Sequence, residues 1–241
     1  MLDWRVPGYR TVRELRAPDA ARRSVLAVHE ASGLPVALRY HAAPERFDAL
    51  RADARALVGV SSPHIAPLYE HIEVVLDGAF GVATVREYVQ GASVRSLLAA
   101  TRPTPASALL LLRCALLALR AAHAAGVTHR ALTPANVVVG ADGVARVTDF
   151  FPADRSDLGE NPESSPQSWI LDDVRAAYAV FAVCVPKPPK PLRGLASLGE
   201  AADATALFDG VEAAGPTAFG PQWRSHAEQD LARLVAKHRE R

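Results

Sequence analysis

The chain has 241 residues, enough for one large domain or for two tightly packed lobes with a sizeable core. Hydrophobic residues make up 49% and charged residues 22%, a balance that excludes disorder as the main state. The formal net charge is +1, so the chain has no overall field to hold DNA, RNA or an anionic membrane. We therefore expect no nucleic-acid partner.

The cysteines and the apolar segments bear on where the protein works. Cys114 and Cys184 lie in apolar stretches without metal-ligand spacing or a disulfide framework, which favours buried free thiols in a reducing cytosol. The longest apolar run, 106–119, is shorter than the roughly 18 residues of a transmembrane helix. The first ten residues lack the apolar core of a signal peptide. We expect a soluble cytoplasmic protein with no membrane segment.

The first third of the chain is predicted to be rich in β-strands. Short apolar runs with β-branched residues, such as 24–29 and 36–40, are separated by turn signals. One helix is predicted over 44–57, where apolar residues recur at spacings of three and four and a proline suits the first turn.

The character of the sequence changes after Gly91 to long stretches of alanine and leucine. A hairpin is predicted from 136–139 and 144–148, joined through a turn that contains Asp142 and Gly143. The proline-rich segment 186–191 is predicted to be an extended surface loop. Helices are predicted over 93–100, 105–125, 172–185 and 225–239.

A longer motif lies between the predicted helices. Residues 127–139 read VTHRALTPANVVV, and the chain continues through Asp142 and Gly143 to the sequence VTDF at 147–150. This segment resembles the catalytic core of bacterial Ser/Thr protein kinases, in which H-R-D-L-K-P-x-N is followed by a strand hairpin and D-F-G. The match is long, ordered and correctly spaced.

Other segments resemble kinase landmarks in the expected order. Residues 36–39 resemble the third-strand V-A-I-K, residues 86–89 the hinge, and Asp173 the buried anchor of a helix in the large lobe. The resemblance implies an α+β, two-lobed protein-kinase-like fold. It places a small antiparallel β-rich N-lobe at residues 9–89 and a helical, shortened C-lobe at residues 90–240.

The groups that perform chemistry in the resembled family are replaced here. Ala131 stands where the catalytic-loop Asp accepts the hydroxyl proton, and Thr133 where a Lys stabilises the transferring phosphate. An alanine cannot take a proton, and general-base catalysis contributes about 10² to 10⁴ in rate. We therefore expect no catalytic residues in this chain.

The nucleotide-binding positions also depart from the family pattern. Arg39 replaces the third-strand lysine and is paired by resemblance with Asp53 in place of a glutamate, which makes these two a degenerate nucleotide clamp. The chain has no lysine before Lys187 that could substitute for the missing one. Residues 16–24, where a Gly-rich phosphate loop belongs, contain no glycine.

Asn136 and Asp149 match the positions that hold metal ions in the family, and two interpretations of them stay open. In the first, they retain residual binding of Mg²⁺ and nucleotide. In the second, Asn136 caps a loop and Asp149 accepts hydrogen bonds from backbone amides. Phe151, in place of the D-F-G glycine, favours the second. The resemblance gives His123 and His129 an architectural role.

These features predict a pseudokinase, a catalytically inactive scaffold or regulatory binding module with absent or weak nucleotide binding. We expect no cofactor, with weak binding of Mg-ATP as the alternative. Two other functions stay open: a weakly active atypical Ser/Thr kinase using ATP and Mg²⁺, and a nucleotide-gated switch without phosphoryl transfer. Similarity to actinobacterial pseudokinase modules implies protein partners, such as an active kinase or a phosphothreonine-reading domain.

Overall fold

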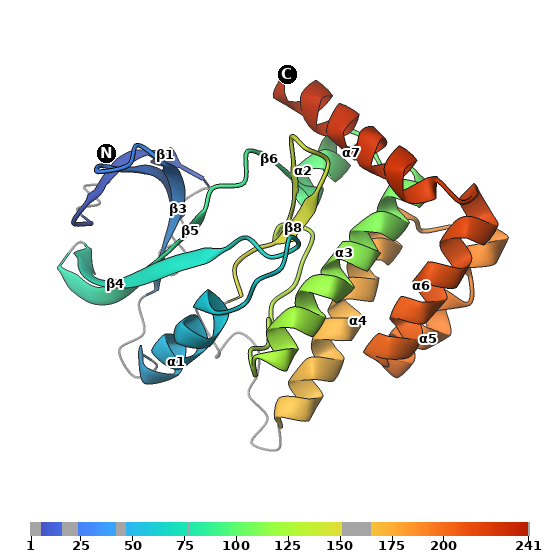
Figure 1. The fold of residues 1–241 in the computed structure, drawn as a ribbon, viewed down its shortest axis with the longest axis horizontal. Coiled ribbons are helices and arrows are strands. Elements are labelled where there is room, and N and C mark those ends of the chain that lie inside the picture. The colour runs from blue at the N-terminus through green and yellow to red at the C-terminus, as the bar shows by residue number, and fades with distance from the viewer. Residues whose placement is uncertain (1–5, 16–23, 42–46, 77, 151–164, 241) are drawn as a thin grey trace.

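A computed structural model describes residues 6–15, 24–41, 47–76, 78–150 and 165–240. Figure 1 shows two lobes, one built around a twisted sheet with a single helix and the other almost entirely helical. This is the shortened, kinase-like two-lobed α+β architecture expected from the sequence. The segment 16–24, apart from Ser24, and Phe151 lie outside the described residues.

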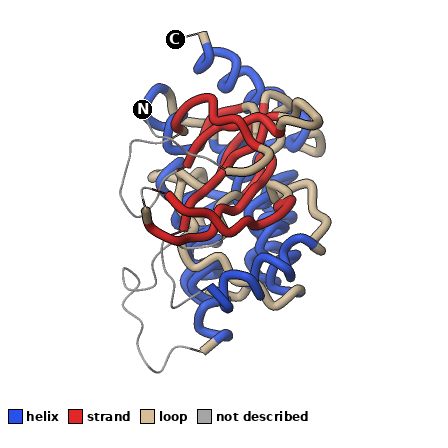
Figure 2. The backbone as a smooth tube through the Cα atoms, turned by 90° about the vertical axis from the view of Figure 1, so that its left-hand side faces the viewer, coloured by secondary structure: helices blue, strands red, loops and turns tan. Residues whose placement is uncertain are grey.

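The sheet lobe holds five antiparallel strands in the order β1-β2-β3-β5-β4. Helix α1 packs against β4 on one side of this sheet, and Figure 2 shows the curved strands from the side. The strands predicted at 24–29 and 36–40 are present as β2 and β3. The helix predicted over 44–57 is present as α1, and its first three predicted residues, 44–46, lie outside the described range. The elements are β1 (Tyr9–Glu14), β2 (Ser24–His29), β3 (Pro35–His41), α1 (Phe47–Val58), β4 (Leu68–Leu76) and β5 (Ala79–Glu87).

The helical lobe surrounds α3, which packs against α4, α6 and α7. Thr104 caps the N-terminus of α3 by accepting a hydrogen bond from the Ser107 amide, and Gly126 follows its end with a φ of 78°. The elements are β6 (Gly91–Ser93), α2 (Val94–Ala100), α3 (Pro105–Ala124), β7 (Val137–Gly140), β8 (Ala145–Val147), α4 (Pro166–Cys184), α5 (Leu195–Ala201), α6 (Ala204–Phe219) and α7 (Trp223–Arg239).

Helix α3 is long and apolar enough to cross a membrane by length and composition alone. The apolar run 106–119 is shorter than the roughly 18 residues of a transmembrane helix, but the helix that contains it has 20 residues. Of its most apolar stretch, 67% is buried inside the protein. Burial against three neighbouring helices makes α3 the central helix of the core.

The predicted buried thiols are confirmed, and two boundaries differ from prediction. Cys114 and Cys184 are buried and unpaired, and burial raises their pKa values to about 12 and about 11. Helix α4 begins at Pro166, earlier than predicted, because Ser165 and Ser168 form a capping box before it. The proline-rich segment ends in a 3₁₀ turn at Lys190–Leu192, whose leucine is buried.

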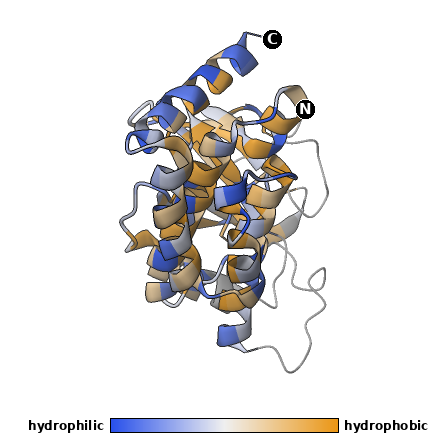
Figure 3. Ribbon diagram, turned by 90° about the vertical axis from the view of Figure 1, so that its right-hand side faces the viewer, coloured by the Kyte–Doolittle hydropathy of each residue, from blue (hydrophilic) through white to orange (hydrophobic). Residues whose placement is uncertain are grey.

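Helices α5 and α6 were not predicted, because their sequences contain glycines and a proline that disfavour helix. These glycines lie at close contacts between helices. A Cβ on Gly199 would come within 2.3 Å of the Tyr178 ring, and one on Gly215 within 2.3 Å of the Trp223 ring. Figure 3 shows α7, which begins at this tryptophan, as mostly hydrophilic above the apolar helices.

Replacing Gly215 with alanine should destabilise the protein by about 1–3 kcal/mol, because the fully buried Trp223 ring leaves no space for a methyl group. Urea unfolding measures the change. Gly194→Ala is the matched control, since a Cβ there has no neighbour within 4 Å, and its free energy of unfolding should change by no more than about 0.5 kcal/mol. Equal effects of the two variants would contradict this account of α6 packing.

Candidate functional site

The two lobes meet where the segment before β4 lies beside β8. The Ala66 amide donates to the Val147 carbonyl at 3.0 Å, and the Val147 amide donates to the His64 carbonyl at 2.8 Å. These bonds place the residues that follow β8, Thr148 to Phe150, at the edge of the sheet lobe. Residues 148–150 therefore lie between the two lobes.

The backbone of the catalytic-like loop is held by a single buried carboxylate. Asp173, on α4, accepts hydrogen bonds from the amides of His129 at 2.7 Å and Arg130 at 2.6 Å. Its Oδ2 also lies 2.8 Å from Nε2 of His123. Because the Asp173 side chain is only 1% exposed, these contacts anchor the loop to α4, as the resemblance implied.

His129 is a structural group rather than a proton carrier. Its Nδ1 accepts from the Ala131 amide at 3.2 Å, which assigns the ring proton to Nε2, and Nε2 donates to the Thr148 carbonyl at 3.0 Å. Burial lowers the pKa of His129, so the ring is neutral near pH 7. Its ring lies beside the Phe150 ring in a tilted arrangement, with centroids 4.8 Å apart.

The loop itself carries no group that could act as a base at position 131. Thr133 accepts a hydrogen bond from the Ala135 amide through Oγ1 at 3.3 Å. Nδ2 of the buried Asn136 donates to the Ala131 carbonyl at 2.8 Å. The amide of Asn136 therefore closes the loop, the arrangement expected if this residue has a capping role.

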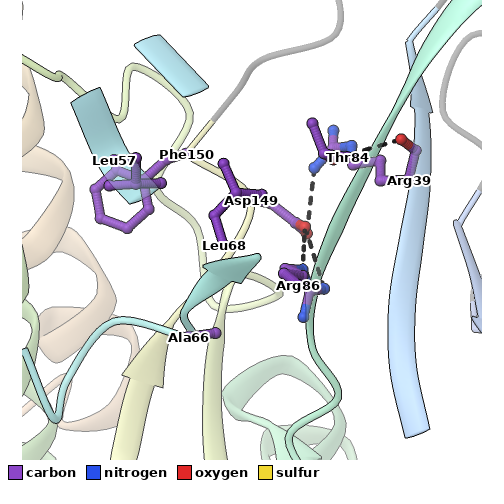
Figure 4. Close-up of a pocket in the computed structure, with 8 residues that line it drawn as sticks. All are labelled: Arg39, Leu57, Ala66, Leu68, Thr84, Arg86, Asp149 and Phe150. Carbon is purple, nitrogen blue, oxygen red and sulfur yellow. Dashed lines mark hydrogen bonds and ion pairs between the residues drawn. The ribbon is translucent and has the colours of Figure 1, made fainter. Parts of the chain in front are cut away.

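Asp149 occupies the centre of the site, and two arginines close its carboxylate (Figure 4). Arg39 Nη1 lies 3.2 Å from Oδ2, while Arg86 approaches Oδ1 with both Nη2 and Nε at 3.2 Å. The Asp149 side chain is 2% exposed, and its backbone has a φ of 63°. We call Arg39, Arg86 and Asp149 the arginine clamp.

This arrangement differs from the pairing that the resemblance implied. The ion pair of Arg39 is made with Asp149, whereas Asp53 lies half-buried on α1. Arg39 stands on β3 opposite Thr84 on β5, in the middle of the sheet, so its side chain can reach the residues that follow β8.

Arg86 is a site residue that sequence reasoning missed. Residues 86–89 were assigned to the hinge, yet the Arg86 side chain turns into the site and also donates to the Glu87 carbonyl at 3.1 Å. The signal in the sequence is a single arginine at the end of the apolar strand β5, opposite Ala37 and Leu68 in the neighbouring strands. An inward charge on a buried strand requires a partner.

The charges of the site do not fit a divalent cation. Two guanidinium groups face one carboxylate, and the neighbouring His41 is neutral because burial, reinforced by Arg39, lowers its pKa to about 3. Both Asp149 oxygens already face guanidinium groups, so a cation at Asp149 would have to displace them. Among the described residues, no cluster of three His, Cys, Asp or Glu side chains could hold a metal ion.

A small cavity lies beside the clamp, with an apolar wall formed by α1, β4 and Phe150 (Figure 4). Its inner volume is about 10 Å³, which corresponds to about one water molecule. This cavity has no room for a nucleotide. It is lined by Arg39, Leu57, Ala66, Leu68, Thr84, Arg86, Asp149 and Phe150.

Arg130 is held beside the loop by α4. Its Nε donates to Thr128 Oγ1 at 2.9 Å, and its guanidinium lies 3.5 Å from the centroid of the Trp169 ring. This cation–π contact fixes the arginine on the helix that follows the undescribed segment 151–164. Arg130 therefore has a structural contact, consistent with a loop that is braced rather than reactive.

No protein-family model matches the chain. It is 40% identical over 92 residues to the serine/threonine-protein kinase PknD of Mycobacterium tuberculosis, covering 38% of this chain and 13% of that protein. It is 33% identical over 154 residues to the serine/threonine-protein kinase PknA of the same organism, and this match covers 59% of this chain and 36% of PknA. A probable serine/threonine-protein kinase of Streptomyces coelicolor is 34% identical over 101 residues, and this match covers 42% of this chain and 15% of that kinase.

The matched region thus spans little more than a third of the length of PknA and less of the other two. The similarity is shared by three bacterial Ser/Thr protein kinases, and it agrees with the two-lobed fold. It shows a kinase-like relationship over part of the chain.

Asp173→Asn should destabilise the protein by about 2–4 kcal/mol, because a buried carboxylate with three hydrogen-bond contacts loses its charge and an acceptor. Thermal or urea unfolding measures the loss. The neighbouring Asp172→Asn is the control, since the Asp172 side chain is 64% exposed and should contribute less than about 0.5 kcal/mol. A stable Asp173→Asn variant would remove the anchoring role from Asp173.

Proposed function

We propose that this chain is a pseudokinase module, a kinase-like scaffold or regulatory binding module that performs no phosphoryl transfer. The observation that supports this most directly is the closure of the Asp149 carboxylate by Arg39 and Arg86. In kinases the corresponding Asp holds Mg²⁺ on the nucleotide phosphates. Here a metal ion would have to displace two guanidinium groups from a buried carboxylate.

The catalytic loop supports the same proposal. Phosphoryl transfer depends on positioning and electrostatic stabilisation, with an Asp that accepts the proton of the attacking hydroxyl. The Ala131 side chain cannot accept this proton, and the neighbouring His129 is committed to backbone hydrogen bonds through both ring nitrogens. The loop retains its hydrogen-bonded architecture without the groups that act on a substrate.

The two alternatives require the clamp to open. A weakly active atypical kinase would use Arg39, Asn136 and Asp149 to hold Mg-ATP, but these side chains already contact other protein groups. A nucleotide-gated switch needs the same binding site without the chemistry. We therefore rank both below the pseudokinase, and nucleotide binding is the measurement that separates them.

A module without chemistry acts through what it binds. We infer that its partner is a cytoplasmic protein, and the kinase-like fold suggests an active Ser/Thr kinase or a phosphothreonine-reading domain as the class of partner. The similarity to bacterial Ser/Thr protein kinases supports this inference.

The wild-type protein should bind Mg-ATP with a dissociation constant above about 100 μM and transfer no phosphate to itself or to generic substrates. Calorimetric titration and incorporation of labelled phosphate measure the two quantities. Incorporation that persists in an Asp149→Ala control indicates a contaminating kinase. Incorporation that this substitution abolishes, or micromolar binding that requires Mg²⁺, would refute the proposal.

Freeing the Asp149 carboxylate should increase the affinity for Mg-ATP, even though catalysis stays absent. In Arg39→Lys/Arg86→Met both guanidinium groups are removed, and the affinity should rise at least about tenfold, the equivalent of 1.4 kcal/mol. Arg39→Lys/Ala131→Asp leaves Arg86 on Asp149, so it should restore neither binding nor turnover. Turnover in this second variant would show that the site is closer to a working kinase than its geometry indicates.

A further inference from the structure

The arginine clamp joins the two lobes of the protein. Arg39 stands on β3 and Arg86 on β5, both in the sheet lobe, whereas Asp149 follows β8 in the helical lobe. Three contacts of 3.2 Å connect the guanidinium groups to the two carboxylate oxygens. The lobes are therefore linked by direct contacts between charged protein groups at the place where a kinase would hold its ligand.

The remaining contacts between the lobes are of a different kind. Backbone hydrogen bonds join Ala66 to Val147, and Phe150 shares an apolar cluster with Leu57 and Leu68. A second ion pair joins Arg146 to Glu87 at 3.6 Å, a longer distance than the 3.2 Å contacts of the clamp. The Glu87 side chain is also more exposed than that of Asp149. The clamp is thus the buried charged link between the lobes among the described residues.

We propose that the clamp takes the place of a bound nucleotide and holds the lobes closed without any ligand. In a nucleotide-bound kinase the third-strand lysine, the phosphates, the metal ions and the D-F-G aspartate form a chain between the lobes. Here the guanidinium groups reach the aspartate directly. This inference rests on the proposed function, because it assumes that the site does not bind nucleotide.

Burial shields the clamp from solvent. The side chains of Asp149, Arg39 and Arg86 are 2%, 8% and 15% exposed, so solvent and salt screen their attraction only weakly. Opening the lobes would separate these opposite charges and break all three contacts between them. Arg39 Nε is buried without a hydrogen-bond partner among the described residues, and the Arg39 side chain reaches Asp149 through Nη1.

A closed, ligand-independent arrangement has a consequence for regulation. A nucleotide that binds the open and the closed arrangement equally cannot shift the equilibrium between these two arrangements. The surface that the two lobes form together is therefore always presented to a partner. Control of the module must come from partner concentration or from modification outside the cleft.

The distance between two spin labels, one in each lobe, tests the proposal. Leu34→Cys, in the exposed turn before β3, and Arg175→Cys, on the outer side of α4, provide the labelling sites. The native Cys114 and Cys184 are buried with raised pKa values, so they react far more slowly than exposed thiols. Pulsed electron paramagnetic resonance then gives the distribution of lobe separations.

The labelled wild type should show one narrow distance distribution that Mg-ATP does not change. Arg86→Met, which keeps the length of the side chain and removes its charge, should broaden the distribution or shift it by about 2 Å or more. Arg146→Met is the matched control, because it removes an arginine that also joins the lobes but whose carboxylate partners, Glu87 and Asp142, are 31% and 49% exposed. Its distribution should equal that of the wild type.

An unchanged distribution in Arg86→Met, or equal broadening in Arg146→Met, would overturn the clamp. If Arg86→Met does not fold, Arg86→Gln, which also removes the charge, replaces it, and a distribution identical to wild type would have the same meaning. Titration of the wild type with Mg-ATP keeps the two proposals apart. If Mg-ATP binds tightly and the lobes loosen in Arg86→Met, the proposed absence of nucleotide binding is refuted, but the clamp as a link between the lobes is supported. If Mg-ATP does not bind and the lobes are unchanged in Arg86→Met, the absence of nucleotide binding is supported and the clamp is refuted.

Discussion

The structure of the site depends on a carboxylate that the backbone fixes in a buried position. Asp149 adopts a φ of 63°, and the residue before it is held on both sides: the Thr148 carbonyl accepts from His129, and the Thr148 amide donates to the Asn136 carbonyl. These contacts fix the backbone from which the buried Asp149 side chain extends. A buried charge of this kind needs a positive partner, and the identity of that partner determines what the site can do.

In this structure the positive partners of Asp149 are two arginines. A guanidinium group is planar, remains charged and offers several N–H donors, so one arginine can approach a carboxylate oxygen with two nitrogens, as Arg86 does. A second guanidinium, from Arg39, covers the other oxygen. The surplus of one positive charge then opposes any cation that would enter.

The scaffold around this contact is held together by buried anchors and close helix packing. Asp173 fixes the catalytic-like loop to α4, and the central helix α3 is buried against three others. Glycines at the interfaces of α5 and α6 allow these short helices to pack closely on α4 and α7. If the chain is the binding module that we propose, this framework would present one shape with or without a ligand.

The sequence by itself determined the order of the strands and of the main helices, the position of the kinase-like loop and the loss of a base at Ala131. These features are local, because strand alternation, helical periodicity and motif spacing are set by residues close together in the chain. The tertiary structure alone decided that Arg39 pairs with Asp149, and that Arg86, 63 residues away from that aspartate, joins them. It also decided that the glycine-rich stretch before the last helix forms α5 and α6. Ion pairs and close helix contacts depend on which distant segments meet in space, and that information is not contained in the local pattern of either segment.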